Sequence, residues 1–357
     1  MPKGLAPRAA RAGALSCLAV AVLAAFVAAP ASALPRGVPR PFPVCIQMGG
    51  QAGPDIAGSL VVWTDGRNGN LDIYGRDLRR ARDIPICTDD AQQDNPSVTR
   101  YVTPDGKTRS IAVWVEHRAH VSDGGGDIYG RDLARRREFV VARGAGLRWY
   151  PEIIDHWVVW IEADLPGGPY RVRARDLDAG TTYLVATSRV LSPVAVGRRT
   201  VGAETVYTAV YASGQGDISA RDLPGGDPVR VAQTDRFEWW PDISGDRVVW
   251  WEEGGRVMTR DLTAGRTSFV HLGSRPRVDG EFVVWDGGGS GGSFTIDYVP
   301  GAKVYVRDLA RGGRVTAIGQ SHLTCLFPAV SGRRVVWESG PAKRVLSHIH
   351  IYGAWVR

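Results

Sequence analysis

Residues Pro54–Leu78 read PDIAGSLVVWTDGRNGNLDIYGRDL, and units of this kind recur six more times along the chain. A proline opens each unit, at Pro54, Pro96, Pro151, Pro193, Pro241, Pro276 and Pro328. A V-V-W-like run then ends at Trp63, Trp114, Trp160, Tyr207, Trp250, Trp285 and Trp337, and Arg-Asp-Leu follows in six units. Seven copies at a spacing of about 46 residues predict a propeller rather than separate domains.

Each unit predicts four short antiparallel strands, here called A to D. In the first unit, strand A is PDIAG, strand B is the β-branched and aromatic run LVVW, and strand C is the alternating DIYGRDL. Strand D is the run before the next proline, such as IPICT at Ile84–Thr88. We therefore expect an all-β, seven-bladed β-propeller of four-stranded antiparallel blades. Six blades remain the alternative if the weak fourth unit is not a blade.

The two ends of the repeat array predict how the ring closes. Pro43–Gly49 resembles a D strand without its own A, B and C strands, and the last unit stops at Arg357 after strand C. An N-terminal D strand that completes the C-terminal blade would leave no open sheet edge.

Three stretches resemble the repeats of TolB-like propellers: Pro241–Glu253 (PDISGDRVVWWEE), Asp65–Leu78 (DGRNGNLDIYGRDL) and Thr103–Lys107 (TPDGK). The resemblance covers nearly all of residues 43–357. Such propellers occur in periplasmic and cell-surface proteins of prokaryotes. They act as protein-interaction modules, as domains attached to peptidases, and in some cases as polysaccharide lyases, so the resemblance implies a fold and leaves the function open.

The first 33 residues have the composition of a secretory signal. Lys3, Arg8 and Arg11 precede an apolar run over residues 14–29, and Ala31-Ser32-Ala33 has the small-residue cleavage pattern. Sixteen apolar residues are fewer than the ~20 that a membrane span needs. We expect residues 1–33 to be a signal peptide, 34–42 a proline-rich lead-in and 43–357 one propeller domain. The protein would then be secreted, periplasmic or on the cell surface, without a membrane span after cleavage.

The net charge of the processed chain narrows the class of partner. Cleavage would leave 41 basic against 37 acidic residues, a net charge of +4, which does not indicate nucleic-acid binding. We expect a monomer that binds a protein or glycan of the cell envelope.

Export permits disulfides, and Cys45 with Cys325 is the most plausible pair among Cys45, Cys87 and Cys325, although three free thiols are the alternative.

Residues that recur in nearly every unit are expected to build blades. The aspartate of Arg-Asp-Leu can cap the turn between strands C and D through backbone amides; it stands at Asp77, Asp132, Asp176, Asp222, Asp261 and Asp308. The tryptophans of strand B should be core. The B–C loops vary most in length, and they share one face of the disc with the D–A connections. That face is where we expect a binding site.

Two kinds of side chain on that face stand outside the repeat. Trp149-Tyr150 and Trp239-Trp240 directly precede an opening proline and suit sugar rings or peptide side chains, unless they pack between blades. Asp55, Glu152 and Asp242 directly follow the proline, at the predicted mouth of the central channel. Convergent carboxylates could hold a cation such as calcium or could pair with arginines such as Arg67.

The first B–C loop also has the spacing of an oxygen-ligand site. Asp65, Asn68, Asn70 and Asp72 could bind Ca²⁺, but Asn68-Gly69 is equally typical of a hairpin turn.

Enzyme signatures are mostly absent, and no catalytic residue is assigned. The sequence therefore favours a non-enzymatic binding propeller. The alternative is a carbohydrate-active enzyme, a polysaccharide lyase or hydrolase, that uses the carboxylates at the channel mouth.

Overall fold

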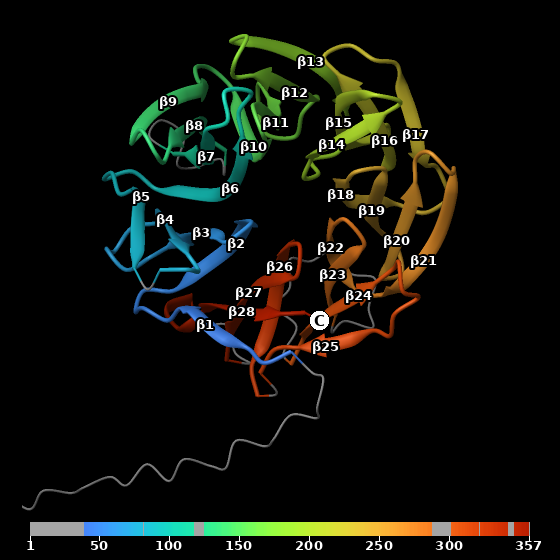
Figure 1. Cartoon of the computed structure of the whole chain (residues 1–357). Coiled ribbons are helices and arrows are strands. Elements are labelled where there is room, and N and C mark those ends of the chain that lie inside the picture. Colours follow the sequence, from blue (N-terminus) through green and yellow to red (C-terminus); the bar gives the residue numbers. More distant parts are fainter. Residues whose placement is uncertain are drawn as a thin grey trace, which may run out of the picture. The chain divides into compact units, whose positions relative to one another are not determined.

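The computed structural model describes residues 39–80, 82–117, 125–287, 301–320, 322–341 and 346–356. Within the unit Arg36–Arg357, seven four-stranded antiparallel sheets stand in a ring (Figure 1). A cavity lined by the innermost strand of every sheet lies at the centre and is called the central channel below. This is the seven-bladed β-propeller that the repeat predicts. The predicted signal segment, residues 1–33, lies outside the described residues. Within the described part of the chain, no helix has the length and apolar character needed to cross a membrane.

The strands of the first four blades follow the chain in order. They are β2 (Gln51–Ala57), β3 (Leu60–Asp65), β4 (Asp72–Asp77) and β5 (Asp83–Cys87) in blade 1; β6 (Gln93–Val102), β7 (Thr108–Glu116), β8 (Asp127–Asp132) and β9 (Arg137–Ala142) in blade 2; β10 (Leu147–Ile154), β11 (Trp157–Ala163), β12 (Tyr170–Asp176) and β13 (Thr181–Ser188) in blade 3; and β14 (Ala195–Val201), β15 (Glu204–Ser213), β16 (Asp217–Leu223) and β17 (Pro228–Ala232) in blade 4.

The last three blades contain the remaining strands and one short 3-10 helix, η1 (Leu346–His348). They are β18 (Glu238–Ser244), β19 (Arg247–Glu252), β20 (Arg256–Asp261) and β21 (Arg266–Leu272) in blade 5; β22 (Ser274–Asp279), β23 (Phe282–Gly287), β24 (Lys303–Asp308) and β25 (Thr316–Ile318) in blade 6; and β26 (Thr324–Ser331), β27 (Arg334–Gly340), β28 (His350–Trp355) and β1 (Phe42–Cys45) in blade 7.

Blade 7 closes the ring with the N-terminal strand, as predicted. Strand β1 pairs antiparallel with β28, with Phe42 opposite Gly353 and Cys45 opposite Ile351. The fourth unit forms a complete blade, β14–β17, so the six-bladed alternative is wrong.

The first strand of each blade lies next to the channel and the last strand lies at the rim (Figure 1). The strand B tryptophans are fully buried, as expected from their recurrence. They pack between blades: one core cluster joins Val62 and Ile86 of blade 1 to Val98 and Trp114 of blade 2. The apolar runs of strand B are therefore covered on both faces, which explains why they lack alternation.

The strand register corrects one landmark of the repeat. In the other blades that have both landmarks, the buried tryptophan lies three residues after the strand B partner of the Arg-Asp-Leu aspartate. In blade 4, Asp222 pairs with Thr208, so Tyr211 and not Tyr207 takes the place of the tryptophan. The A–B hairpin is longer in this blade, which shifts the spacing. Tyr207 instead donates its hydroxyl to Asp155 at 3.0 Å.

The Arg-Asp-Leu aspartates cap the C–D turns, as predicted. In five blades the Oδ1 atom accepts a backbone N–H from the turn at 2.7–3.1 Å; the acceptors are Asp77, Asp132, Asp176, Asp261 and Asp308. Asp222 is the exception, because its carboxylate accepts from the hydroxyl of Thr208 at 2.5 Å.

We expect Asp176→Ala to lower the free energy of unfolding by about 1 kcal/mol, the usual cost of a lost cap. Asp176 accepts from the N–H groups of Asp178 and Ala179 at 2.9 and 3.0 Å. Asp176→Asn, which keeps an acceptor oxygen, should lose less. Urea denaturation of the three proteins measures the effect, and equal midpoints for wild type and Asp176→Ala would remove the capping role.

All three described cysteines are buried free thiols. The suggested pairing of Cys45 with Cys325 is wrong, because the sheet order β1-β28-β27-β26 places two strands between them. At about 4.8 Å per strand, this separation exceeds what a disulfide spans.

Candidate functional site

A shared backbone irregularity shapes the channel mouth. The innermost strand of six blades has a register shift around its opening proline. In these blades the residue before the proline has a positive φ of 48–57°; the six residues are Gly53, Asn95, Tyr150, Trp240, Arg275 and Phe327. A residue other than glycine in this region costs on the order of 1 kcal/mol. Five of the six residues are not glycine, so five blades have this unfavourable conformation at the same position before the proline.

These residues line one cavity of about 320 Å³. The rings of Tyr150, Trp240 and Phe327 form its aromatic walls, together with the opening prolines of several blades. Trp240 and Phe327 lie edge to face, with 6.5 Å between ring centroids. The guanidinium of Arg275 stacks 4.2 Å from the centroid of Phe327, and its Nε donates to Asp286 at 2.7 Å. The stack holds a cation and two rings from three blades in fixed positions.

The three carboxylates predicted at the channel mouth converge on one arginine. Arg277 of β22 lies 2.6 Å from Glu152, 3.3 Å from Asp242 and 3.6 Å from Asp55, measured between nitrogen and oxygen atoms. These four residues belong to blades 6, 3, 5 and 1. The carboxylates do pair with an arginine, but the expected partners, arginines of neighbouring hairpins such as Arg67, are wrong: Arg277 comes from across the channel, and Arg67 pairs with Asp65 and Asp83.

The same positions also join neighbouring blades. The Oδ2 atom of Asp55 accepts the backbone N–H of Val98 at 2.8 Å, and Asp242 accepts that of Val278 at the same distance. Each carboxylate therefore fixes the innermost strand of the next blade as well as facing the channel. Asp55 and Asp242 have a structural role that the repeat filter did not reveal.

Glu152 is the carboxylate most changed by the site. Burial raises its pKa to about 7, although Arg277 acts in the opposite direction, and the charges of Asp55 and Asp242 add to the rise. Burial also raises the pKa of Asp242. Near neutral pH, Glu152 can therefore hold or release a proton at the base of the mouth.

The structure separates the members of each predicted aromatic pair. Tyr150 and Trp240 line the mouth, whereas Trp149 is only 7% exposed and packs edge to face on Tyr170 in the core of blade 3. Trp239 is half-buried and contacts Trp240, with 5.5 Å between centroids. The packing alternative thus holds for Trp149, while the positions of Tyr150 and Trp240 suit contact with a ligand.

The loop predicted to bind calcium is held by protein contacts. Asp65 forms an ion pair with Arg67 at 2.5 Å, and the amide of Asn68 donates to Asp72 at 2.6 Å. The amide of Asn70 donates to two backbone carbonyls. This is the geometry of a braced hairpin, and it gives the calcium prediction for these four residues no support.

Another group of possible metal ligands lies between blades 1 and 2. Cys87, Asp89 and Glu116 place three potential ligand atoms within 4.8 Å of one another. Burial raises the pKa of the Cys87 thiol to about 12, so the thiol keeps its proton at neutral pH.

Comparisons with known proteins find the fold and no family. No protein-family model and no curated protein matches the chain. Oligogalacturonate lyase from Vibrio parahaemolyticus is similar in structure, with a TM-score of 0.56 and 11% identity over 88% of this chain and 92% of that chain. The β-propeller domain of the Trilobed protease from Pyrococcus furiosus has a TM-score of 0.55 and 13% identity over 87% and 96%. At such identities the likeness shows the fold alone.

A TolB protein is also among the similar solved structures. TolB from Acinetobacter baumannii matches with a TM-score of 0.45 and 12% identity, over 80% of this chain and 59% of that chain. The β-propeller architecture is established, and the TolB-like repeat remains a resemblance.

Sequence reasoning missed Arg277, Arg275, Asn95 and Phe327 at the mouth. The signal was available in part, because three of them occupy the position before the proline that drew attention to Tyr150 and Trp240. Arg277 follows its proline, at the position of the three carboxylates, and a comparison of that position across all units would have shown one basic residue beside three acidic and three uncharged ones.

Proposed function

We propose that this chain is an extracytoplasmic binding protein whose channel mouth holds a protein or glycan partner of the cell envelope. The observation that carries the proposal is the run of five non-glycine residues with positive φ around one cavity. Backbone strain at equivalent positions of several blades persists where the side chains serve a purpose. Aromatic walls over a charged floor suit a sugar ring or a peptide side chain.

The cellular location and the monomeric state are parts of the same proposal. The location rests on the composition of residues 1–33. Size-exclusion chromatography of the processed protein, with mass spectrometry of its N-terminus, tests both.

An enzymatic role at the same site is the second candidate. Glu152 and Arg277 at 2.6 Å combine a carboxyl that titrates near neutral pH with a cation, and a lyase needs such a base and such a charge stabiliser. One similar structure is an oligogalacturonate lyase in complex with manganese. The described lining of the mouth contains neither His nor Lys, so the base of such a reaction would be a carboxylate. Absorbance of unsaturated products from acidic polysaccharides tests this candidate.

We expect Tyr150→Gly and Trp240→Gly each to weaken binding at least about tenfold, because each removes an aromatic anchor. Glycine suits the φ of 52° and 57° at these positions, so each variant should lose less stability than the core variant Trp250→Ala. A glycan array and a pull-down from the native envelope would identify the ligand, and calorimetry would give the affinities. Trp355→Ala, at an exposed tryptophan of β28, is the matched control.

A different result would assign the two rings to packing rather than to binding. If Tyr150→Gly and Trp240→Gly bind as wild type does, but unfold as readily as the core variant Trp250→Ala, the two rings serve packing and the mouth is not the binding site.

A further inference from the structure

A second feature lies on the other face of the disc, the face that carries the turns between strands C and D. The turns of the first two blades are unusually basic: Arg79, Arg80 and Arg82 in blade 1, and Arg135, Arg136 and Arg137 in blade 2. The equivalent six residues after the capping aspartate contain no arginine in blades 3 and 4, one in blade 5 and two in blade 6. The repeat therefore does not require this concentration of charge.

Arg136 stands where the turn favours glycine. Its φ is 53°, and the equivalent residues of three other turns are Gly180, Gly265 and Gly312, with φ of 71°, 66° and 58°. The conformation is shared, and the blade 2 turn adopts it with a long cationic side chain. An arginine that stands here against the local backbone preference points to a role for its side chain.

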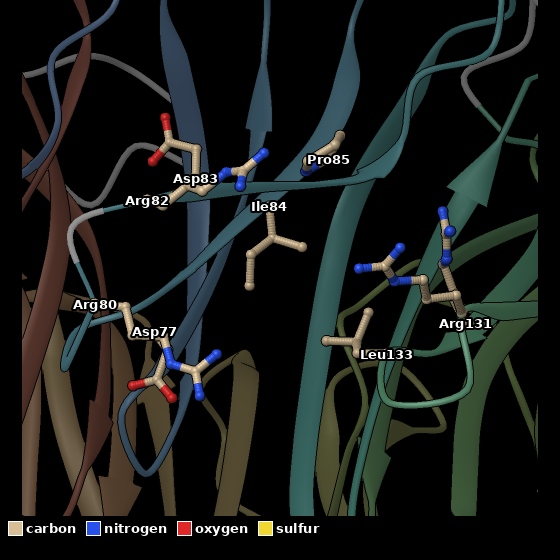
Figure 2. A pocket seen from close by; sticks show the side chains of 9 residues that line it. Asp77, Arg80, Arg82, Asp83, Ile84, Pro85, Arg131 and Leu133 are labelled. Atoms are coloured by element: carbon tan, nitrogen blue, oxygen red, sulfur yellow. The ribbon is translucent and has the colours of Figure 1, made fainter.

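The basic turns border a groove of about 490 Å³ between blades 1 and 2. Figure 2 shows Arg80 and Arg82 on the side of β5, with Arg131 and Leu133 of blade 2 across from them. Ile84, Pro85 and Leu133 give the groove an apolar surface between its charged edges. The space suits a small number of sugar rings, whose C–H faces can pack on apolar side chains.

The two acidic residues of the groove already have partners. Asp77 pairs with Arg79 and Arg100, and Asp83 pairs with Arg67 and Arg76. These contacts leave little negative charge to neutralise the remaining arginines.

The four arginines of the groove differ in what they contact. Arg131 donates to the carbonyl of Ile86, a blade-to-blade contact that Arg221 and Arg307 repeat elsewhere in the ring. The side chains of Arg80, Arg82 and Arg136 make no hydrogen bond or ion pair with any residue that the structure describes. Three exposed guanidinium groups therefore face the groove without a counter-charge.

We propose that this groove is a second binding site, specific for an anionic glycan whose carboxylate or sulfate groups pair with Arg80, Arg82 and Arg136. Guanidinium groups bind such oxyanions through paired hydrogen bonds. The predicted export of the protein favours a glycan over nucleic acid as the polyanion. The site is independent of the channel mouth, because the C–D turns lie at the opposite strand ends from the D–A connections.

The test measures binding of the full processed chain to five probes: a polyglucuronate oligomer, dextran sulfate, neutral dextran, polyglutamate and polyphosphate. Charge reversal in Arg80→Glu/Arg82→Glu should weaken binding of the uronate or the sulfated probe at least about tenfold. Arg266→Glu/Arg314→Glu is the matched control, since it changes the net charge equally at exposed arginines of blades 5 and 6. Tyr150→Gly should bind these probes as wild type does, which separates this site from the mouth.

A single substitution separates binding from folding. Arg136→Gly places in blade 2 the residue that the sister turns use, so its melting temperature should equal or exceed that of wild type while its affinity for the anionic probe falls. A structural role for Arg136 would lower both.

The uronate and sulfate arms identify which oxyanion the groove prefers. The proposal is overturned if neither probe binds, if neutral dextran binds equally well, or if only polyglutamate or polyphosphate binds. It is also overturned if Arg80→Glu/Arg82→Glu and the control variant lose the same affinity.

Discussion

Arg277→Leu should be among the most destabilising single substitutions in this protein, with a loss of about 3–5 kcal/mol in the free energy of unfolding at pH 8. The guanidinium contacts Glu152, Asp242 and Asp55 from three other blades. Its removal leaves three carboxylates facing one another in the channel without a counter-charge. Thermal and urea denaturation measure the loss.

The loss should depend on pH, and its sign follows from proton binding. The pKa of Glu152 is already raised to about 7, so the folded state binds more protons than the unfolded chain between roughly pH 4.5 and 7. Stability from this group is therefore present at low pH and is lost as the pH rises through 7. Without Arg277 the carboxylates should hold their protons more tightly, so the defect of Arg277→Leu should be smaller at pH 5 than at pH 8.

Two control variants are needed for this experiment. Arg314→Leu removes an exposed arginine of blade 6 and should be nearly neutral. Arg277→Leu/Glu152→Gln should recover part of the stability at pH 8, because it removes one of the three carboxylates that Arg277→Leu leaves without a counter-charge. An Arg277→Leu defect that is small, or equal at both pH values, would contradict the role of Arg277 as the shared counter-ion.

A chain that lacks residues 34–50 should lose the monomeric, cooperatively folded state. This deletion removes β1, the outermost strand of blade 7, and with it the buried side chains of Val44 and Cys45. The outer edge of β28 would then present unpaired backbone groups to other molecules. Size-exclusion chromatography should show aggregates, and the melting transition should fall or disappear.

The matched control is a chain that lacks only residues 34–38, which precede β1. It should remain monomeric and melt as wild type does. A Δ34–50 protein that is monomeric with the wild-type melting temperature would contradict closure of the ring by the N-terminal strand.

The fold could be predicted from the sequence because the residues that determine it recur in most of the units. The strand B tryptophans, the capping aspartates and the opening prolines each appear in most units, so one misassigned residue, Tyr207, did not disturb the prediction. The orphan strand before Gln51 was recognisable for the same reason, since it resembles the D strands of other units.

The site could be predicted from the sequence only in part, because it depends on contacts across the channel. Neighbouring strand residues point to opposite faces, so Trp149 and Tyr150 could not both face a ligand. Which of the two does so depends on a bulge at the proline, and the repeat pattern does not specify that bulge. Arg277 lies 125 positions from Glu152 in the sequence, and only the closed ring brings them to 2.6 Å.

Hydrogen exchange of the full processed chain, with and without the ligand found by the array, tests most directly whether the channel mouth is the binding site. Binding there should slow exchange at the backbone amides of Asn95, Tyr150, Trp240 and Phe327, around four blades at once, and leave the C–D turns of blades 1 and 2 unchanged. Protection confined to those turns, or to the rim strands, with unchanged exchange at these four residues would contradict the proposed function.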